Sequence, residues 1–410
     1  MKILVYEHVS GGGYSEEHID LSVLSEGFGM LRCLTADLKA AGHELTALLD
    51  SRISKLNPPL AVDCIVPVFH AGETAKFLLK ATEINDAAYI IAPETDETLE
   101  STVRLLEETG KVSLNSKADT IHQVADKTVL SETLKDKGLR VPKTIIFDAN
   151  PKADEVNNAI KSHLTYPVIL KPSDGVSCGG LTIVERETQT ERAMAKLKAG
   201  SRGKRFIAQE FVRGEAASVS LLCAGTQSLA LSLNKQNVQL ASVDRKSSYV
   251  GGVVPLDHPM KQEAFDTAEK IAGIFHGLRG YVGVDLILSE NGPCVVDVNP
   301  RLTTSYIGLS RVAGFNVANA MVNAVLKGRL PAKREGVGCF WFSKVETPKP
   351  TLHAFAKSKR IKGLISPPFL FKRSPRAVSL VAGYGETSTE AERRFEEAKK
   401  RLLNIISEGD

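Results

Sequence analysis

The sequence predicts a chain of mixed class, α/β and then α+β: an N-terminal domain with a doubly wound parallel sheet, followed by a two-lobed region of antiparallel strands. Two patterns support this. Up to about residue 115, short apolar runs alternate with helical patterns, as in strands joined by crossover helices. From Tyr166 onward, strands follow one another with short turn signals, as in hairpins. At 410 residues the chain exceeds what one hydrophobic core usually organises, so we expect two or three domains.

The N-terminal elements follow from their periodicity. We expect a strand at MKILVYE and then an amphipathic helix that ends at Gly42. Further strands are predicted at ELTALLD, AVDCIVPVF and AYIIAPE, and helices over 73–84 and at DETLESTVRLLEETG, which stops at Gly110. Ligands of doubly wound sheets bind beyond the carboxyl ends of the strands, so a site is expected there.

The remaining elements are predicted in the same way. Residues 115–149 contain two helical patterns and then the strand VPKTIIFD. The next strands are PVILKP, GLTIVE, RFIAQEFV, ASVSLLCA, QSLALSLNKQ, YVGVDLIL and PCVVDVNP, with helices at 191–198 and 262–275. Gly225 and the pair Asn291-Gly292 mark hairpin turns. Prolines become frequent after Gly328, and the chain closes with a strand and a long amphipathic helix.

Composition and charge argue against several classes of protein. Apolar residues make up 43 % and charged residues 24 %, as in ordinary globular proteins. A net charge of +4, from 52 basic and 48 acidic residues, is too balanced to predict nucleic-acid binding. The apolar runs are too short to span a bilayer, no signal peptide is evident, and the six cysteines lack CxxC spacing. We therefore expect a cytoplasmic protein that acts on small molecules.

Three oxygen-bearing side chains predict a metal site. Asp285 interrupts the apolar run GYVGVDLIL, and VVDVNPR then places Asp297 and Asn299 two positions apart. Alternate residues of a strand share a face, so these side chains should point the same way. A single aspartate would be explained as readily by a salt bridge. For the set of three we favour a hard cation such as Mg²⁺, because a buried carboxylate is costly unless it is paired or bound to metal.

A glycine-rich segment and two lysines predict contacts to phosphates. Lys171 ends a strand, and Gly175, Gly179 and Gly180 follow it in PSDGVSCGGL, where they allow close backbone approach. Such a hairpin can close over phosphates as a lid while the lysine supplies charge. It does not match the Walker pattern GxxxxGK[ST]. Lys127 lies in a mixed helix ahead of it and would, by itself, be a surface lysine.

Two further segments complete the candidate site. The segment IAQEFVRGE runs from a strand into a turn, where backbone groups could bind an adenine edge and a carboxylate could hold ribose. Arg301 and the hydroxyls of Thr303 and Thr304 follow the predicted metal strand. A guanidinium at that place could bind an anionic substrate or the transferring phosphoryl group.

In this order and spacing, these motifs resemble the ATP-grasp superfamily, over residues from about 116 to 325. The resemblance implies ATP and Mg²⁺ or Mn²⁺, as one or two ions, as cofactors. It implies that the two lysines contact phosphates, that QEFV is the adenine hinge, and that the two acids and the asparagine hold the metal. Nucleotide binding is thereby assigned to Lys127, Lys171, Gly175, Gly179, Gly180, Gln209, Glu210, Phe211, Val212 and Glu215.

The same resemblance divides the chain. It implies a pre-ATP-grasp domain at 1–115, an ATP-grasp domain at 116–330, and an extension at 331–410 that completes the ATP-grasp region. Within the second part we expect a lid subdomain at about 120–205 and a metal and nucleotide subdomain at 206–330. Two departures matter. Glu215 directly follows Gly214 where the family usually has G-x-E, so the ribose contact is shifted or absent, and Gly283 replaces an arginine of many D-alanine–D-alanine ligases.

A narrower resemblance rests on the segments YEHVSGGG, LSEGFGMLR, IAPETD, LNKQ, YVGG and NPRLTTSY. They are similar to the tyramine–L-glutamate ligases of methanofuran biosynthesis and their relatives. This implies L-glutamate as the carboxyl donor and tyramine as the amine, joined through an acyl phosphate, and a homodimer is a candidate assembly. Arg301 and Lys171 are the expected catalytic residues. The candidates for the substrate pocket are Tyr249, Gly251, Gly252, Thr304 and Tyr306, with Glu7 and Glu26 as contributors from the N-terminal domain.

Three other functions stay open. A carboxylase working through carboxyphosphate would use the same scaffold, although no biotin-attachment segment is evident. A non-catalytic ATP-binding regulatory protein could keep the fold, although intact metal ligands argue against it. A dehydrogenase could be suggested by SGGG after the first strand, but G-x-G-x-x-G is absent there.

Overall fold

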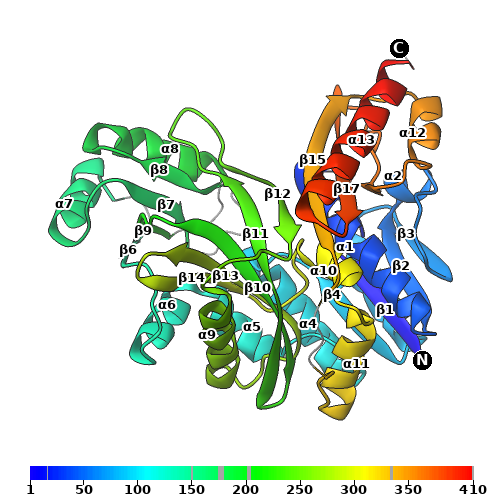
Figure 1. Cartoon of the computed structure of the whole chain (residues 1–410), viewed down its shortest axis with the longest axis horizontal. Coiled ribbons are helices and arrows are strands. Elements are labelled where there is room, and N and C mark those ends of the chain that lie inside the picture. The colour runs from blue at the N-terminus through cyan, green and yellow to red at the C-terminus, as the bar shows by residue number, and fades with distance from the viewer. Residues whose placement is uncertain (16, 149–150, 174–179, 201–204, 333–335, 409–410) are drawn as a thin grey trace.

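A computed structural model describes residues 1–15, 17–148, 151–173, 180–200, 205–332 and 336–408. Within them lie a parallel sheet of five strands and two antiparallel sheets of four and eight strands. In Figure 1 the four-stranded sheet and its helices occupy one end of the molecule, and the N-terminal sheet and the C-terminal helix occupy the other. None of the helices described is long and apolar enough to cross a membrane.

The N-terminal sheet has the strand order β3-β2-β1-β4-β5, with every pair parallel. This confirms the predicted doubly wound domain. Asp20 caps the first long helix by accepting hydrogen bonds from the backbone of Ser22 and Val23, which explains where that helix begins. The elements are β1 (Lys2–Glu7), α1 (Leu21–Ala40), β2 (Glu44–Asp50), α2 (Ser51–Ser54), β3 (Cys64–Val68), α3 (Thr74–Glu83), β4 (Ala87–Ile91), α4 (Thr98–Glu108) and β5 (Val112–Ser113).

The four-stranded sheet has the order β6-β9-β7-β8 and is antiparallel. The helix α7 before β7 was not predicted, because its buried stripe is short: Val156, Asn157 and Ile160 lie among polar residues. The elements are α5 (Ala118–Ala125), α6 (Lys127–Asp136), β6 (Thr144–Phe147), α7 (Ala153–His163), β7 (Val168–Pro172), β8 (Thr182–Val184), α8 (Thr190–Gly200) and β9 (Phe206–Glu210).

The eight-stranded sheet has the order β14-β13-β10-β11-β12-β15-β17-β16, so strands from the C-terminal part join those that carry the predicted metal ligands. The β12–β15 pair makes this junction. The strands are β10 (Glu215–Ala224), β11 (Gln227–Gln239), β12 (Ser248–Val254), β13 (Gly280–Ser289), β14 (Gly292–Asn299), β15 (Cys339–Pro348), β16 (Leu364–Ser366) and β17 (Arg376–Gly385). The helices are α9 (Lys261–Ile274), α10 (Tyr306–Val312), α11 (Val317–Lys327), α12 (Leu352–Ser358) and α13 (Ser388–Ser407).

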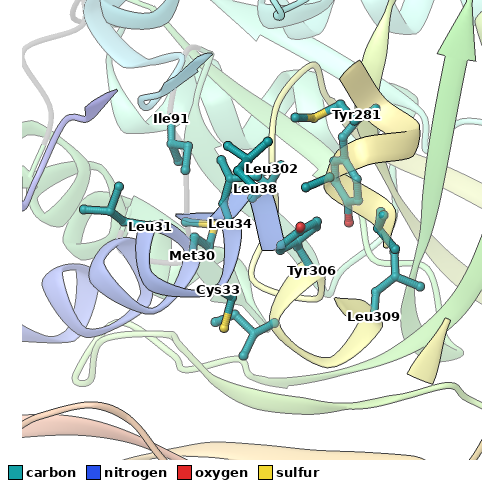
Figure 2. Packing of buried hydrophobic residues seen from close by; sticks show 14 of the residues in the cluster. Met30, Leu31, Cys33, Leu34, Leu38, Ile91, Tyr281, Leu302, Tyr306 and Leu309 are labelled. Atoms are coloured by element: carbon teal, nitrogen blue, oxygen red, sulfur yellow. The ribbon is translucent and has the colours of Figure 1, made fainter. Parts of the chain in front are cut away.

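A shared apolar core fixes the N-terminal domain against the end of β14. Figure 2 shows Leu34 and Leu38 of α1 close to Leu302 and Tyr306, which follow that strand, and all four belong to one buried cluster. Polar contacts secure the same seam, since the Tyr306 hydroxyl donates to Asp37 Oδ2 at 2.7 Å. The loop after β14, which carries the predicted catalytic arginine, is therefore packed against helix α1 of the N-terminal domain.

Candidate functional site

Asp285, Asp297 and Asn299 lie together on one face of the β13–β14 hairpin. Asp285 is the direct cross-strand partner of Asp297. The Asn299 amide donates to Asp285 Oδ2 at 3.1 Å, whereas Val284 and Val298 are buried on the opposite face. Strand alternation places Asp297 and Asn299 on one face, and a register shift between Asp285 and Leu286 brings Asp285 opposite Asp297.

Local packing explains why position 283, where many D-alanine–D-alanine ligases carry arginine, is a glycine in this chain. A Cβ atom there would lie 2.4 Å from Thr303 Cγ2, so a side chain at this position would collide with the loop after β14. The Thr303 hydroxyl in turn bonds the Tyr281 hydroxyl at 3.0 Å. The space that an arginine would occupy is thus filled by a threonine anchored in the sheet.

The electrostatics of this hairpin favour a bound cation. Burial, and then repulsion from Asp297, raise the pKa of Asp285 to about 6. The Gln236 amide donates to Asp285 at 2.9 Å, and the ammonium of Lys127 contacts Asp297 at 2.8 Å. Burial alone would lower the pKa of Lys127, but Asp297 raises it on balance. One lysine against two carboxylates leaves a net negative charge on these three side chains, before nearby Arg301 is counted.

The donor set also fits a hard cation. No cluster of three or more histidine, cysteine, aspartate or glutamate side chains suited to a metal occurs among the described residues. A cation on the hairpin would instead take two carboxylates and the amide oxygen of Asn299, whose nitrogen is already engaged. An all-oxygen set of this kind suits Mg²⁺ or Mn²⁺ rather than a soft metal.

Of the residues predicted to contact phosphates, Lys127, Lys171 and Gly180 lie within the described part of the chain. Lys127, expected by itself to be a surface residue, is instead buried, with 8 % of its surface exposed. Lys171 is buried on β7, opposite Ile207 of β9. Gly180 lies beside the ring of Pro172, and Gly175 and Gly179 lie outside the described residues.

The predicted adenine hinge follows β9. The Gln209 amide donates to the Thr144 hydroxyl at 3.0 Å. The backbone N–H of Glu210 donates to the Lys143 carbonyl at 2.8 Å, and its carboxylate accepts from the Lys143 N–H at 3.1 Å. These bonds fasten the hinge to β6. They leave Phe211 and Val212 in the connection between two strands.

Glu215, the candidate for ribose, is engaged by another residue. Its carboxylate lies 2.9 Å from the ammonium of Lys235, on the neighbouring strand β11. Lys235 belongs to the LNKQ segment, as does the Gln236 that contacts the metal hairpin. The lysine was singled out in a motif but was given no role.

Arg301 forms a buried ion pair with Glu94, which follows β4 of the N-terminal domain. The guanidinium donates to Glu94 at 2.8 Å and to the Leu302 carbonyl at 3.0 Å. Burial alone would lower the pKa of Arg301, but Glu94 raises it on balance. Arg301 Nε and Glu94 Oε1 are buried and have no hydrogen-bond partner among the residues that the structure describes, so both side chains retain bonding capacity.

Glu94 was not predicted as a site residue. Its signal was present, since it stands in the IAPETD segment at the carboxyl end of a parallel strand, where ligands of such sheets bind.

A second ion pair joins Glu26 of α1 to Lys344 of β15. The Thr304 hydroxyl donates to Glu26 at 2.9 Å, and the Lys344 ammonium lies 5.6 Å from the centre of the Tyr249 ring. Two of the predicted pocket residues, Tyr249 and Thr304, are thus brought together with Glu26. Lys344 was missed, because it lies in a proline-rich stretch where no strand was predicted.

Glu7 occupies a different kind of position. Its carboxylate accepts hydrogen bonds from the Val9 N–H at 3.0 Å and from the backbone and hydroxyl of Ser10 at 2.7 and 2.6 Å. A Cβ atom on Gly27 would lie 2.5 Å from it, so α1 closes over the carboxylate. Glu7 therefore organises the SGGG loop, and Arg301 is close enough to influence its carboxylate.

The other predicted pocket residues, Tyr306, Gly251 and Gly252, contribute to the packing of the core and of the sheet. Tyr306 is 0 % exposed and bonded to Asp37, on the core side of the loop. A Cβ atom added to Gly251 would lie 2.1 Å from the carbonyl oxygen of Phe342, and one added to Gly252 would lie 2.3 Å from the carbonyl oxygen of Lys235. These glycines let β12 approach its neighbours closely, and they also weakened the strand pattern of β12 in the sequence.

Comparisons with known proteins agree with this architecture. Residues 124–305 match the family model of the ATP-grasp domain, and residues 43–121 match that of the pre ATP-grasp 3 domain. The tyramine–L-glutamate ligase of Methanocaldococcus jannaschii is 28 % identical over 314 residues, which cover 75 % of this chain and 84 % of that protein. The enzyme of the same name from Methanocaldococcus fervens is 32 % identical over 232 residues, which cover 57 % and 64 %.

Solved structures share the fold. An ATP-grasp superfamily protein from Archaeoglobus fulgidus superposes with a TM-score of 0.62 at 24 % identity and covers 93 % of this chain and 99 % of its own. The biotin carboxylase domain of 2-oxoglutarate carboxylase from Hydrogenobacter thermophilus, in complex with MgADP and bicarbonate, gives 0.73 at 14 % identity, covering 99 % and 93 %. With both domains matched, and with ligases among its relatives, the chain belongs to the ATP-grasp superfamily, as an ATP-dependent ligase that forms carbon–nitrogen bonds.

Proposed function

We propose that the chain joins L-glutamate to tyramine, with ATP and Mg²⁺ or Mn²⁺, through an acyl phosphate. The names of two relatives support the choice of substrates. The observation that carries the proposal is the meeting of Asp285, Asp297 and Lys127 at the hairpin, with Arg301 close enough to influence both acids. Such a set of charges, together with a bound metal ion, can bind a nucleoside triphosphate and a second anion at the same time.

The proposed reaction has two steps. An oxygen of the glutamate carboxylate bonds to the γ-phosphorus while the bond to the ADP oxygen breaks, which gives an acyl phosphate and ADP. The nitrogen of the uncharged amine then bonds to the acyl carbon, phosphate leaves with the electron pair of the carbon–oxygen bond, and the nitrogen loses a proton to solvent. In phosphoryl transfer a protein contributes chiefly positioning and charge neutralisation.

The residues of the hairpin fit a divalent cation, and Asp285, Asp297 and Asn299 would hold one or two ions. When bound, the metal would neutralise phosphate charge. Lys127 and Lys171 would bind phosphate oxygens, as the family resemblance implies. Arg301 would stabilise the charge that develops at the reacting carboxylate, because its buried Nε donates no hydrogen bond within the described part of the chain.

The remaining assignments belong to the same proposal. The hinge Gln209, Glu210, Phe211 and Val212 would bind adenine, and Gly175, Gly179 and Gly180 would belong to a lid that excludes water from the acyl phosphate. Glu215 would bind the ribose hydroxyls while its carboxylate also keeps its ion pair with Lys235. The domain limits 1–115, 116–330 and 331–410, a homodimer and a cytoplasmic location are also proposed.

The test is a substrate panel with ADP release and product mass as readouts. We expect ADP release to require both glutamate and tyramine, and the product to have the mass of the two less one water. Carboxylases share this fold at low identity, so bicarbonate is included in the panel. Release that depends on bicarbonate, or no release with any acid and amine, would overturn the proposal.

A further inference from the structure

The Glu26–Lys344 ion pair is sheltered and makes contacts beyond the pair itself. The side chains are only 16 % and 11 % exposed. Glu26 also accepts from the Thr304 hydroxyl at 2.9 Å, and the Lys344 ammonium also bonds the Ser22 hydroxyl at 2.7 Å. Each charge thus has a hydroxyl beside it and an oppositely charged neighbour.

The pair lies close to the proposed reaction centre along the chain. Thr304 is three residues after Arg301, and three residues span at most ~10 Å between their Cα atoms. Both belong to the loop that follows β14, which the core cluster holds against α1. A molecule whose carboxylate reaches Arg301 could therefore place its other end at Glu26 and Lys344.

The charges of the pair favour one class of ligand over another. An amine alone could bind Glu26, but it would take the carboxylate from Lys344 and leave a sheltered ammonium without a counter-charge. Breaking a buried pair in this way is strongly unfavourable. A zwitterion avoids the difficulty, because its ammonium can meet Glu26 while its carboxylate meets Lys344.

We propose that Glu26 and Lys344 bind the α-ammonium and α-carboxylate groups of the amino-acid substrate, with Thr304 and Ser22 as additional hydrogen-bonding groups. The side-chain carboxylate of glutamate is then the group that extends toward Arg301. In the free protein the two residues neutralise each other. This inference rests on the proposed function, since it assumes an amino-acid substrate.

The experiment compares glutamate with two analogues, each of which lacks one α-group. Glutarate has no ammonium and 4-aminobutanoate has no α-carboxylate. For the wild-type protein we expect kcat/KM to fall about 10- to 100-fold or more for either analogue, the range expected for hydrogen bonds between charged groups. Glu26→Gln should lower kcat/KM for glutamate to near that for glutarate while leaving glutarate little changed. Lys344→Met should lower kcat/KM for glutamate to near that for 4-aminobutanoate while leaving the value for 4-aminobutanoate little changed.

Two further variants separate binding from a structural tether. The double variant Glu26→Gln/Lys344→Met removes both charges, so no unpaired charge is left to disturb folding, and it should discriminate against neither analogue. Arg32→Gln is the matched control, because Arg32 ties α1 to the Leu364 and Ile365 carbonyls without touching the pair. We expect Arg32→Gln to keep the wild-type discrimination, with any loss equal for all three substrates.

Several results would overturn the inference. Equal losses for all three substrates in the pair variants would mean that the pair is only a tether. A raised KM for tyramine with unchanged discrimination would mean that Glu26 binds the amine. If wild-type protein releases ADP with another amino acid and not with glutamate, the proposed substrate fails, and the same comparison is made with that amino acid and its deaminated and decarboxylated forms. If no amino acid supports release, both proposals fail.

Discussion

Asp37 makes the stability of the seam between the two parts depend on pH. Burial raises the pKa of Asp37 from its ordinary value of 3.8 to about 6, while the Tyr306 hydroxyl offsets part of that effect. The folded state therefore holds a proton that the unfolded state releases. Stability from this group is fully present below pH 3.8 and is lost as the pH rises through about 6. The shift of about two units corresponds to about 3 kcal/mol.

Replacing Asp37 with asparagine removes this charge and keeps an acceptor for Tyr306. We expect Asp37→Asn to be more stable than wild type by about 1–3 kcal/mol above pH 7, with the difference vanishing toward pH 4. Urea unfolding followed by the fluorescence of Trp341, the single tryptophan, measures this difference. Asp63→Asn is the control of opposite sign, because Lys39 lowers the pKa of exposed Asp63. A difference that is independent of pH, or that grows on acidification, would refute the reasoning.

Three further predictions concern the site itself. Lys127→Met should lower ATP turnover about 100- to 1,000-fold, because the proposed contact to phosphate oxygens is lost; ADP release measures the turnover, and circular dichroism shows whether the loss of the Lys127–Asp297 pair disturbs the fold. Glu94→Gln should lower kcat about 10- to 100-fold with little change in the KM for ATP, since the buried Arg301 loses its charged partner; steady-state kinetics check it. Tyr281→Phe breaks a hydroxyl link between the sheet and the loop after β14 and should destabilise the protein by about 1 kcal/mol, as measured by urea unfolding.

The metal hairpin could be predicted from sequence because its signal is local. Alternation along a strand places Asp297 and Asn299 on one face, and the Asn291-Gly292 turn pairs their strand with the one that carries Asp285. The register shift that makes Asp297, and not Val296, the partner of Asp285 had no signal in the sequence. The strands and helices of the N-terminal sheet have equally local patterns. Strands β1 to β4 and helices α1, α3 and α4 were each predicted from a run of fewer than about 20 residues, whereas the short elements α2 and β5 were not predicted.

The ion pairs between the two parts could not be predicted. Glu94 and Arg301 lie 207 positions apart, so no periodicity in the chain relates them. Single-sequence patterns identified each residue type in an informative segment, but the partner is determined by how the domains pack. The same holds for Glu26 and Lys344, which meet only because β15 joins the sheet next to β12.

Some helices were missed for a different physical reason. α10 is buried at Tyr306, Ile307, Gly308, Leu309 and Val312, so it lacks the polar face that creates an amphipathic signal. It is short, and its apolar residues follow one another without a helical period. Burial on most sides, which fixes the loop carrying Arg301, is the property that conceals the helix in the sequence.

The most direct test of the central claim is ADP release by the variant in which Asp285 and Asp297 are both replaced with alanine. If the β13–β14 hairpin holds the metal that receives the nucleotide phosphates, turnover with glutamate and tyramine should fall at least ~100-fold while the circular dichroism spectrum is unchanged. Turnover equal to that of the wild-type protein would contradict the account.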